Sequence, residues 1–420
     1  MRTLLLILCA AALAAPGVAS ARPAPVTWCG GADERQADRV PELELASTQQ
    51  VRLVYVTPAD GPDNFAAYVS GMATDAAWID EWWEAQDPSR TPRFDRYAFP
   101  GCTSRFGALD IGFVKLRNGG AFYSSADPFY SLSNELATSF PDSEKTIVYY
   151  DGPIPDGNVC GQSPKNAGFG GSYGIAFVYL HSNCGLLPPG AGTSAQVAAH
   201  ELIHNLGALP NGAPNACPGD SGHPCDSESD VLYPYVGDAS TLDAVTLDVN
   251  RDDYYAHSGS WWDVQDSPWL SHLPQFPVAF SVAGSGSLAV RTPTGSLPCD
   301  NGCSDIGVDS DEQVIAVAVP SPGWRVARWS GACTAISLSC TVTVSAPVTA
   351  AVTFERAPVR AVVRITGRGH VTQTRGTGRV RLNAVPARGW RFAGWSGACS
   401  GRGGCVLTQS GTVRARFVKR

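Results

Sequence analysis

The first two-thirds of the chain alternates between the residue spacing of strands and that of helices. Residues 51–56 alternate apolar and polar side chains, which predicts a strand, whereas residues 64–83 repeat apolar positions with the period of a helix. Further strands are predicted at residues 109–116, 146–150 and 175–180. This order of elements predicts an α/β or α+β body.

Another helix is predicted a short loop after the last of these strands. Residues 195–206 are good helix formers, Thr193 or Ser194 can cap the start, and Gly207 can adopt the left-handed conformation that ends a helix. Gly, Pro, Asn, Asp and Ser are frequent in residues 207–230, which predicts a loop.

Beyond about residue 273 the sequence repeats itself. Residues 320–333 read PSPGWRVARWSGAC and residues 386–399 read PARGWRFAGWSGAC, at a constant offset of 66. In each copy a second cysteine follows, and an alternating strand leads to Phe354 or Phe417. Two small all-β modules are therefore expected after the body.

The repeated motif resembles the divergent bacterial repeats related to the internalin B-repeat, a β-grasp-like surface module. The resemblance rests on WSGAC, the short cysteine loop and the terminal V-x-A-x-F strand, and it covers about residues 276–420. It implies one repeat at residues 276–355 and a shortened, arginine-rich repeat at residues 356–420, in which Cys299 and Cys303 have no counterpart.

The N-terminal residues have the pattern of an export signal. Arg2 precedes an apolar run over residues 4–13, and residues 19–21 are the small residues that signal peptidase prefers. Residues 1–21 are predicted to be a signal peptide. No later apolar stretch is long enough to span a bilayer. The protein is therefore expected to be secreted and extracellular, either free or associated with the cell surface.

Cysteine usage agrees with an oxidising compartment. Of the 13 cysteines, Cys9 lies in the predicted leader; an even number remains and none has C-x-x-C spacing, so disulfides are favoured over a zinc-thiolate cluster. Pairing of neighbours along the chain gives six predicted disulfides: Cys29–Cys102, Cys160–Cys184, Cys217–Cys225, Cys299–Cys303, Cys333–Cys340 and Cys399–Cys405.

The strongest chemical signal lies in the predicted helix at residues 195–206. His200, Glu201 and His204 form an H-E-x-x-H motif. Residues four apart lie on one helix face, so the two histidines can bind one zinc ion while the glutamate acts as general base. A pair of structural histidines on a partly buried helix is the alternative.

The H-E-x-x-H-x-x-G segment resembles the metzincin clan of zinc proteases, which implies a zincin-like catalytic domain over residues 22–273. Members of that clan supply a third ligand three residues after the glycine, where this chain has Pro210. The following loop offers other ligands. We favour His223, because a Cys217–Cys225 disulfide would hold its loop near the helix, and Asp226 is the second candidate.

The segment at residues 230–235, DVLYPY, looks like the Met-containing turn of metzincins with Leu232 in place of Met. Together with the long ligand loop, it resembles a group of secreted actinobacterial proteases. Tyr233 or Tyr235 could donate a hydrogen bond to the oxyanion. Ordinary packing of either tyrosine is the alternative.

Two further features involve charge. Asp248, Asn250 and Asp252 match the first half of a calcium loop, so Ca²⁺ is a second candidate cofactor beside Zn²⁺, and an acidic solvated turn is the alternative. Residues 356–420 contain thirteen Arg and one Lys but no acidic residue, which leaves 17 of the 31 basic and all 38 acidic residues in the rest of the chain. The basic repeat is a candidate for binding an anionic cell-surface polymer, but no motif predicts sequence-specific nucleic-acid binding.

Together these features predict a secreted zinc endopeptidase that acts on protein or peptide substrates. The rival hypothesis is a noncatalytic adhesion protein of the cell surface or matrix, whose protease-like body has lost its metal. Intact His200, Glu201 and His204 favour the enzyme, and Pro210 favours the rival.

Overall fold

The chain is described here from a computed structural model. The described residues are 23–30, 49–97, 99, 101–102, 106–125, 127–137, 145–164, 174–208, 212–236, 241–293, 295–297, 299–334, 336–376 and 378–420. They fall into two compact units, Met1–Gln275 and Phe276–Arg420. The predicted signal peptide and Pro210 lie outside the described residues. None of the described helices has the length and hydropathy required to cross a membrane.

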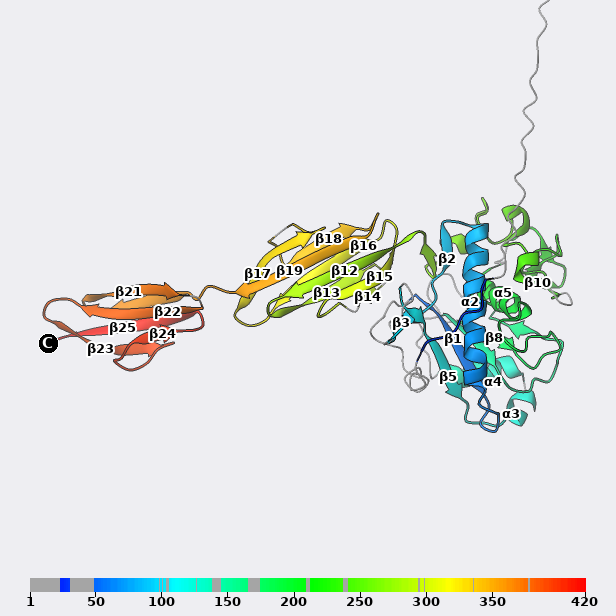
Figure 1. The fold of residues 1–420 in the computed structure, drawn as a ribbon, viewed down its shortest axis with the longest axis horizontal. Coiled ribbons are helices and arrows are strands. Elements are labelled where there is room, and N and C mark those ends of the chain that lie inside the picture. The colour runs from blue at the N-terminus through cyan, green and yellow to red at the C-terminus, as the bar shows by residue number, and fades with distance from the viewer. Residues whose placement is uncertain are drawn as a thin grey trace, which may run out of the picture. The chain divides into compact units, whose positions relative to one another are not determined.

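The first unit is built on a five-stranded sheet (Figure 1). Its strands, in spatial order, are β5 (Ile111–Lys115), β1 (Val51–Thr57), β6 (Lys145–Tyr150), β8 (Gly174–Tyr179) and β7 (Gly161–Gln162). The first four are parallel, and β7 runs antiparallel to β8 at one edge. Strands β1, β6 and β8 are buried along their whole length, as expected of parallel strands covered on both faces.

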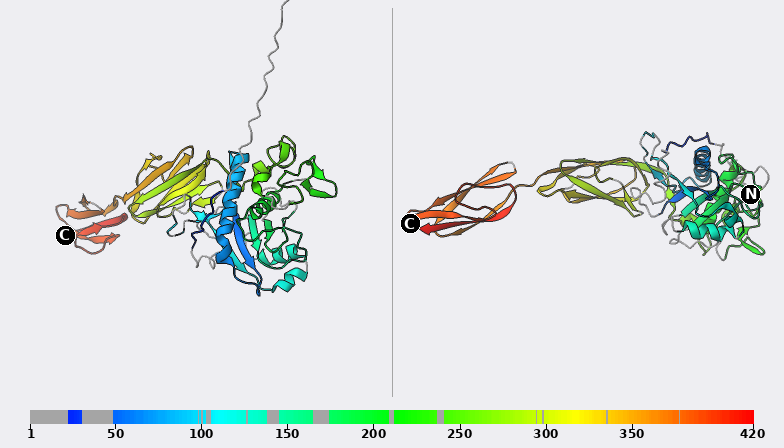
Figure 2. Two further views of the ribbon diagram at one scale, coloured as in Figure 1. Left: turned by 45° about the vertical axis from the view of Figure 1, so that its right-hand side comes forward. Right: turned by 90° about the horizontal axis from the view of Figure 1, so that it is seen from below.

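Helices cover both faces of this sheet, and Figure 2 shows α2 on the opposite side from α3 and α4. Helices α2 (Phe65–Gln86) and α5 (Thr193–Asn205) share one apolar core with the sheet. Helices α3 (Gly120–Ser125) and α4 (Pro128–Leu136) share a second core on the other face. Alternate side chains of β1 enter the two cores, so the unit has a mixed, three-layered architecture.

Shorter elements complete the first unit. They are β2 (Arg90–Pro92), β3 (Arg96–Tyr97), β4 (Ala108–Leu109), β9 (Ala216–Cys217), β10 (Asp220–Pro224), β11 (Leu270–His272) and the 3-10 helices η2 (Leu242–Ala244), η3 (Val249–Arg251) and η4 (Val264–Asp266).

Helix α5 begins differently from the sequence-based prediction. Gly192, whose φ is 107°, precedes the first helical residue, and both predicted caps, Thr193 and Ser194, lie inside the helix. The Ser194 hydroxyl donates to Asp75 of α2 at 2.9 Å, and the Gly190 N–H donates to the same carboxylate at 3.0 Å. A buried carboxylate of the neighbouring helix thus fixes the start of α5.

The first repeat consists of two sheets around one core. One sheet has the order β15 (Cys303–Asp309), β12 (Gln275–Ala283), β19 (Val348–Arg356) and β17 (Trp324–Gly331). The other has the order β14 (Gly295–Leu297), β13 (Gly286–Thr292), β16 (Gln313–Pro320) and β18 (Ser339–Thr343).

The second repeat has the same plan with fewer strands and its own core. Its sheets are β20 (Ala361–Thr366), β25 (Gly411–Lys419) and β23 (Trp390–Gly397), and β21 (Gly369–Gly376), β22 (Arg379–Pro386) and β24 (Cys405–Leu407). An equivalent hydrogen bond marks the repeats: Trp329 Nε1 donates to the Ser337 carbonyl and Trp395 Nε1 to the Gly403 carbonyl, both at 2.9 Å.

All six predicted disulfides are present. They join Cys29 to Cys102, Cys160 to Cys184, Cys217 to Cys225, Cys299 to Cys303, Cys333 to Cys340 and Cys399 to Cys405. Extensive disulfide bonding is typical of proteins in oxidising, extracellular surroundings.

Candidate metal centre and cleft

Helix α5 presents two imidazoles on one face. His200 and His204 are four residues apart, and their Nε2 atoms lie 3.1 Å from each other. Both side chains are almost fully buried, with 8% and 7% of their surface exposed. The helix is buried along its entire length, so its position is set by packing on both sides.

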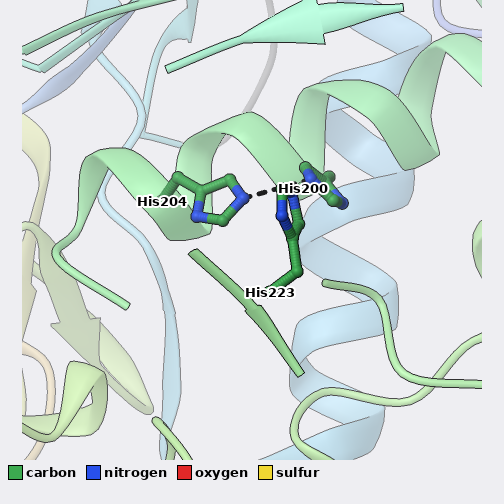
Figure 3. Close-up of side chains that lie close together, drawn as sticks. All are labelled: His200, His204 and His223. Carbon is green, nitrogen blue, oxygen red and sulfur yellow. Dashed lines mark hydrogen bonds between the residues drawn. The ribbon is translucent and has the colours of Figure 1, made fainter. Parts of the chain in front are cut away.

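A third imidazole comes from strand β10. The Cys217–Cys225 disulfide links β9 to the residue that follows β10, and His223 on β10 faces the helix. Ligand atoms of His200, His204 and His223 all lie within 4.8 Å of one another. Figure 3 shows the three rings turned toward a common point.

Two of these rings are oriented by other protein groups. His200 Nδ1 donates to the Val231 carbonyl at 2.7 Å, and His223 Nδ1 lies 2.9 Å from a carboxylate oxygen of Asp220. Metal-binding histidines are usually oriented in this way, with Nδ1 on a carbonyl or carboxylate and Nε2 on the metal. Neither partner was predicted from the sequence, although a carboxylate three residues before a candidate histidine ligand was a usable signal.

The donor set fits zinc. Burial, followed by the nearby His223, lowers the pKa of His200 to about 3, so that this imidazole is neutral. Three neutral imidazoles with a fourth position open toward solvent are the ligand set of many catalytic zinc sites. Two nitrogens bound tetrahedrally at about 2.1 Å would be about 3.4 Å apart, close to the separation of the His200 and His204 nitrogens.

Glu201 lies beside this cluster, against the edge strand β7. Its side chain is 5% exposed, and burial raises its pKa well above the usual value; a cation held by the adjacent histidines would act in the opposite direction. A Cβ atom added to Gly161 would lie only 2.6 Å from Oε1 of Glu201. The missing side chain at Gly161 therefore makes room for the carboxylate.

His200, His223 and Glu201 line a cleft of about 530 Å³. Gly161 of the edge strand β7 and the Cys160–Cys184 disulfide contribute to the lining. The lining residues are Asn158, Val159, Cys160, Gly161, Asn183, Cys184, Gly185, Val197, His200, Glu201, His223, Pro234, Tyr235 and Val236.

The two candidate oxyanion donors differ in position. Tyr235 is 77% exposed and lines the cleft, whereas Tyr233 is half-buried and is not part of the lining. Leu232, at the position of the expected methionine, is completely buried. The turn is held by the buried carboxylate of Asp230, which accepts hydrogen bonds from the Leu232 N–H and the Tyr254 hydroxyl, each at 2.8 Å.

Asp226, the second candidate for the third ligand, joins a different group. Its carboxylate lies within 4.8 Å of those of Asp252 and Asp253, and among the described residues the histidine group contains no carboxylate. Asp248, the first residue of the predicted calcium loop, directs its carboxylate to backbone N–H groups of residues 252–255, including that of Tyr255 at 2.6 Å. These hydrogen bonds stabilise the conformation of the loop in which Asp248 itself lies.

Two segments of the second unit match the model of a known protein family. Residues 295–358 and 362–419 match the model of the divergent InlB B-repeat domain. The prediction of two C-terminal repeats of this kind is confirmed. No match was found among curated proteins.

Solved structures match the chain only distantly. Wild-type OgpA from Akkermansia muciniphila is 12% identical with a TM-score of 0.26, over 65% of this chain and 90% of that one. A second crystal form of the same protein is 11% identical with a TM-score of 0.29, over 89% and 95% of the two chains. Metalloproteinase-II from Bacteroides fragilis is 12% identical with a TM-score of 0.26, over 52% and 58%. Scores this low do not establish a common fold.

Proposed function

We propose that this chain is a zinc-dependent endopeptidase in which His200, His204 and His223 bind the metal and Glu201 is the general base. The observation that carries the proposal is the meeting of three imidazoles from two separate segments beside a buried glutamate on the wall of a cleft. The H-E-x-x-H-x-x-G segment, which resembles that of metzincins, supports the same assignment.

The proposed reaction is hydrolysis of a peptide bond. Zinc, when bound, polarises a carbonyl and increases the acidity of water. Glu201 takes the proton of the attacking water on a carboxylate oxygen and then delivers it to the nitrogen of the leaving amine. Tyr235 is the better placed of the two tyrosines to approach a substrate, because it lines the cleft.

The substrate is proposed to bind as an extended peptide along β7. This strand is at the edge of the sheet, and Gly161 within it lines the cleft. An edge strand offers backbone donors and acceptors with which an added strand can pair. Pairing of this kind would position the scissile bond through its backbone and would leave side-chain preference to the cleft walls.

The proposal also includes the domain bounds and the secretion signal. Residues 22–273 form the protease domain, residues 276–355 and 356–420 form the two repeats, and residues 1–21 direct secretion. Six disulfides support an extracellular location.

The test combines zinc content with cleavage of casein. We expect about one zinc per chain and cleavage by the wild type, and Glu201→Gln should keep the zinc and lose on the order of 1,000-fold in rate. Asp226→Asn is the matched control, since it removes a carboxylate from the same loop region without touching the histidine group. If the wild type binds no zinc and cleaves no protein, the adhesion hypothesis replaces the enzyme.

A further inference from the structure

The two repeats have the same two-sheet plan but opposite charge. Residues 356–420 carry thirteen Arg and one Lys without any acidic residue, whereas residues 276–355 carry three Arg and six acidic residues. Since both sequences form the same kind of core, the fold itself does not require the arginines.

Four of the arginines gather on one face of the sheet β20-β25-β23. Arg414 and Arg416 are exposed on β25, and the residues between and beside them are buried. Arg364 is exposed on β20 and Arg391 on β23. We call these four residues the arginine face.

Strand register brings these side chains close together. Arg364 lies directly opposite Arg414 on the neighbouring parallel strand, and Arg391 lies opposite Val418, two residues beyond Arg416. Neighbouring strands are about 4.8 Å apart, and alternate residues along a strand are about 6.8 Å apart. Like charges directly opposite one another destabilise a sheet, so this array weakens the fold unless an anion lies on it.

The first repeat lacks such an array at the equivalent positions. Its strands β12 and β19 pair in the same parallel fashion, and Ser281, Ala351 and Thr353 occupy the places of Arg364, Arg414 and Arg416. These replacements show that uncharged side chains are compatible with the face.

The two repeats share one arginine position at this face, but the residue opposite that arginine differs between them. In the first repeat Arg325 lies opposite Glu355 and forms an ion pair with it at 2.5 Å. In the second repeat the corresponding pair is Arg391 and Val418. Residues 356–420 contain no Asp or Glu side chain that could neutralise the four arginines of this face.

We propose that the arginine face binds a linear acidic polysaccharide. Guanidinium groups match the geometry of carboxylate and sulfate oxygens, and a row of them along a strand suits an extended polyanion. Exposed hydroxyl groups of Thr366, Thr412 and Ser396 lie on the same face and can bond to sugar hydroxyls.

The composition of the face argues against other polyanions. Binding of single-stranded nucleic acid relies on aromatic side chains that stack on bases, and the described residues of this face include none. Insertion into a membrane surface requires large apolar side chains that enter the lipid, whereas the apolar residues here are Val362 and Val418. Attraction to anionic lipid by charge alone is tested with the vesicles below.

The test uses the full chain and two matched triple variants. The face variant, Arg364→Ser with Arg414→Ala and Arg416→Thr, introduces the residues of the first repeat. The control variant, Arg379→Ser with Arg381→Ser and Arg388→Ser, removes the same charge from exposed positions of β22 and the turn after it. Affinity for polygalacturonate, heparin, duplex DNA and phosphatidylserine vesicles is measured at about 0.1 M salt, with circular dichroism to check folding.

We expect the wild type to bind polygalacturonate or heparin. Comparison of the two affinities shows whether the face prefers carboxylate or sulfate groups. The face variant should weaken this binding on the order of 100-fold, because each cation near an anionic surface contributes roughly a factor of five. The control variant should lose less than about 10-fold. Casein cleavage should be unchanged in both, so a failure here is distinct from a failure of the proposed protease.

Two results would overturn the proposal. Equal losses in the two folded variants would mean that net charge alone, and not this face, attracts the polymer. Binding to DNA or vesicles with none to either polysaccharide would assign the face to a different class of partner.

Discussion

The two units of the chain place their charged groups in opposite environments. In the first unit the candidate general base and two of the candidate metal ligands are almost fully buried, with Glu201 5%, His200 8% and His204 7% exposed. In the second unit the arginine face consists of exposed side chains on strand surfaces. Buried groups depend on every neighbour, whereas exposed charges act almost independently, because water screens them.

This difference sets the expected response to mutation. A single atom added near the buried site should have a large effect, and a single charge removed from the exposed face should have a small, additive one. The following experiments probe that contrast from the largest expected effect to the smallest.

Among these experiments, the largest effect is expected from Gly161→Ala. The added methyl group would lie 2.6 Å from both Oε1 of Glu201 and the Phe177 carbonyl, so either the carboxylate or the edge strand must move. A misplaced general base should reduce casein cleavage on the order of 100-fold. Rates are compared with zinc content and melting temperature, both of which should stay near the wild-type values. An alanine variant with full activity would show that Glu201 does not act from this position.

The first unit also shows where prediction from sequence succeeds and where it ends. Helices α2 and α5 and the strands β1, β5, β6 and β8 were predictable because their apolar spacing is a local property, whereas α3, α4 and β7 were not predicted. His200, Glu201 and His204 were identified because four residues along a helix fix a common face. The expected alternation at residues 51–56 is a different case. Arg52 of this strand is buried beside Asp95, so its polarity does not mark a solvent face.

Contacts between distant segments were beyond a local pattern. His223 and Asp226 were both reasonable third ligands, and only the hairpin of β9 and β10 distinguishes them by grouping one with the histidines and the other with Asp252 and Asp253. The predicted capping residues of α5 were wrong because Asp75, more than a hundred residues away, accepts a hydrogen bond from the Ser194 hydroxyl. The arginine face likewise required the strand register.

The next effect concerns the orientation of His223. Asp220→Ala removes the carboxylate 2.9 Å from His223 Nδ1, and loss of such a partner typically weakens metal binding 10- to 100-fold, so about 30-fold is expected. Zinc affinity is measured by competition with a chelator. Asp226→Ala serves as the control in the same loop and should leave the affinity within about 3-fold. A larger loss in Asp226→Ala than in Asp220→Ala would reverse the ligand assignment.

A buried cation of the first unit offers a contrast with the exposed arginines of the second. Lys145 on β6 is 1% exposed and lies over the ring of Trp269, and burial lowers its pKa from 10.5 to about 8. Below pH 8 the lysine is charged in both states, so the cost of burying the charge is fully present. Between about pH 8 and 10.5 the folded state releases the proton first, and the free energy of unfolding should rise with pH.

Lys145→Met should therefore stabilise the protein at pH 7 by about 2 kcal/mol and remove this rise. The expected gain is less than the roughly 3 kcal/mol that the change in pKa represents, because methionine loses the contact of the ammonium group with Trp269. Urea unfolding at pH 7, 9 and 10 gives the measurement. Lys115→Met, at the exposed lysine of β5, should change the free energy of unfolding by less than about 0.5 kcal/mol. Destabilisation of the Lys145 variant would indicate that its contacts outweigh the cost of burial.

The smallest effect is expected from one charge on the arginine face. Val418→Glu places a carboxylate opposite Arg391, as Glu355 lies opposite Arg325 in the first repeat. Affinity for polygalacturonate should fall about 5-fold, because one cation is neutralised and the others still act. Glu355→Val is the reciprocal control and should change the affinity by less than 2-fold, since the first repeat then presents only Arg325 and Arg328 on this face, beside the uncharged Ser281, Ala351 and Thr353. If Val418→Glu reduced the affinity as much as the triple variant of Arg364, Arg414 and Arg416, the four arginines would act as one cooperative site. The exposed face would then not respond additively, and the contrast with the buried metal centre would fail.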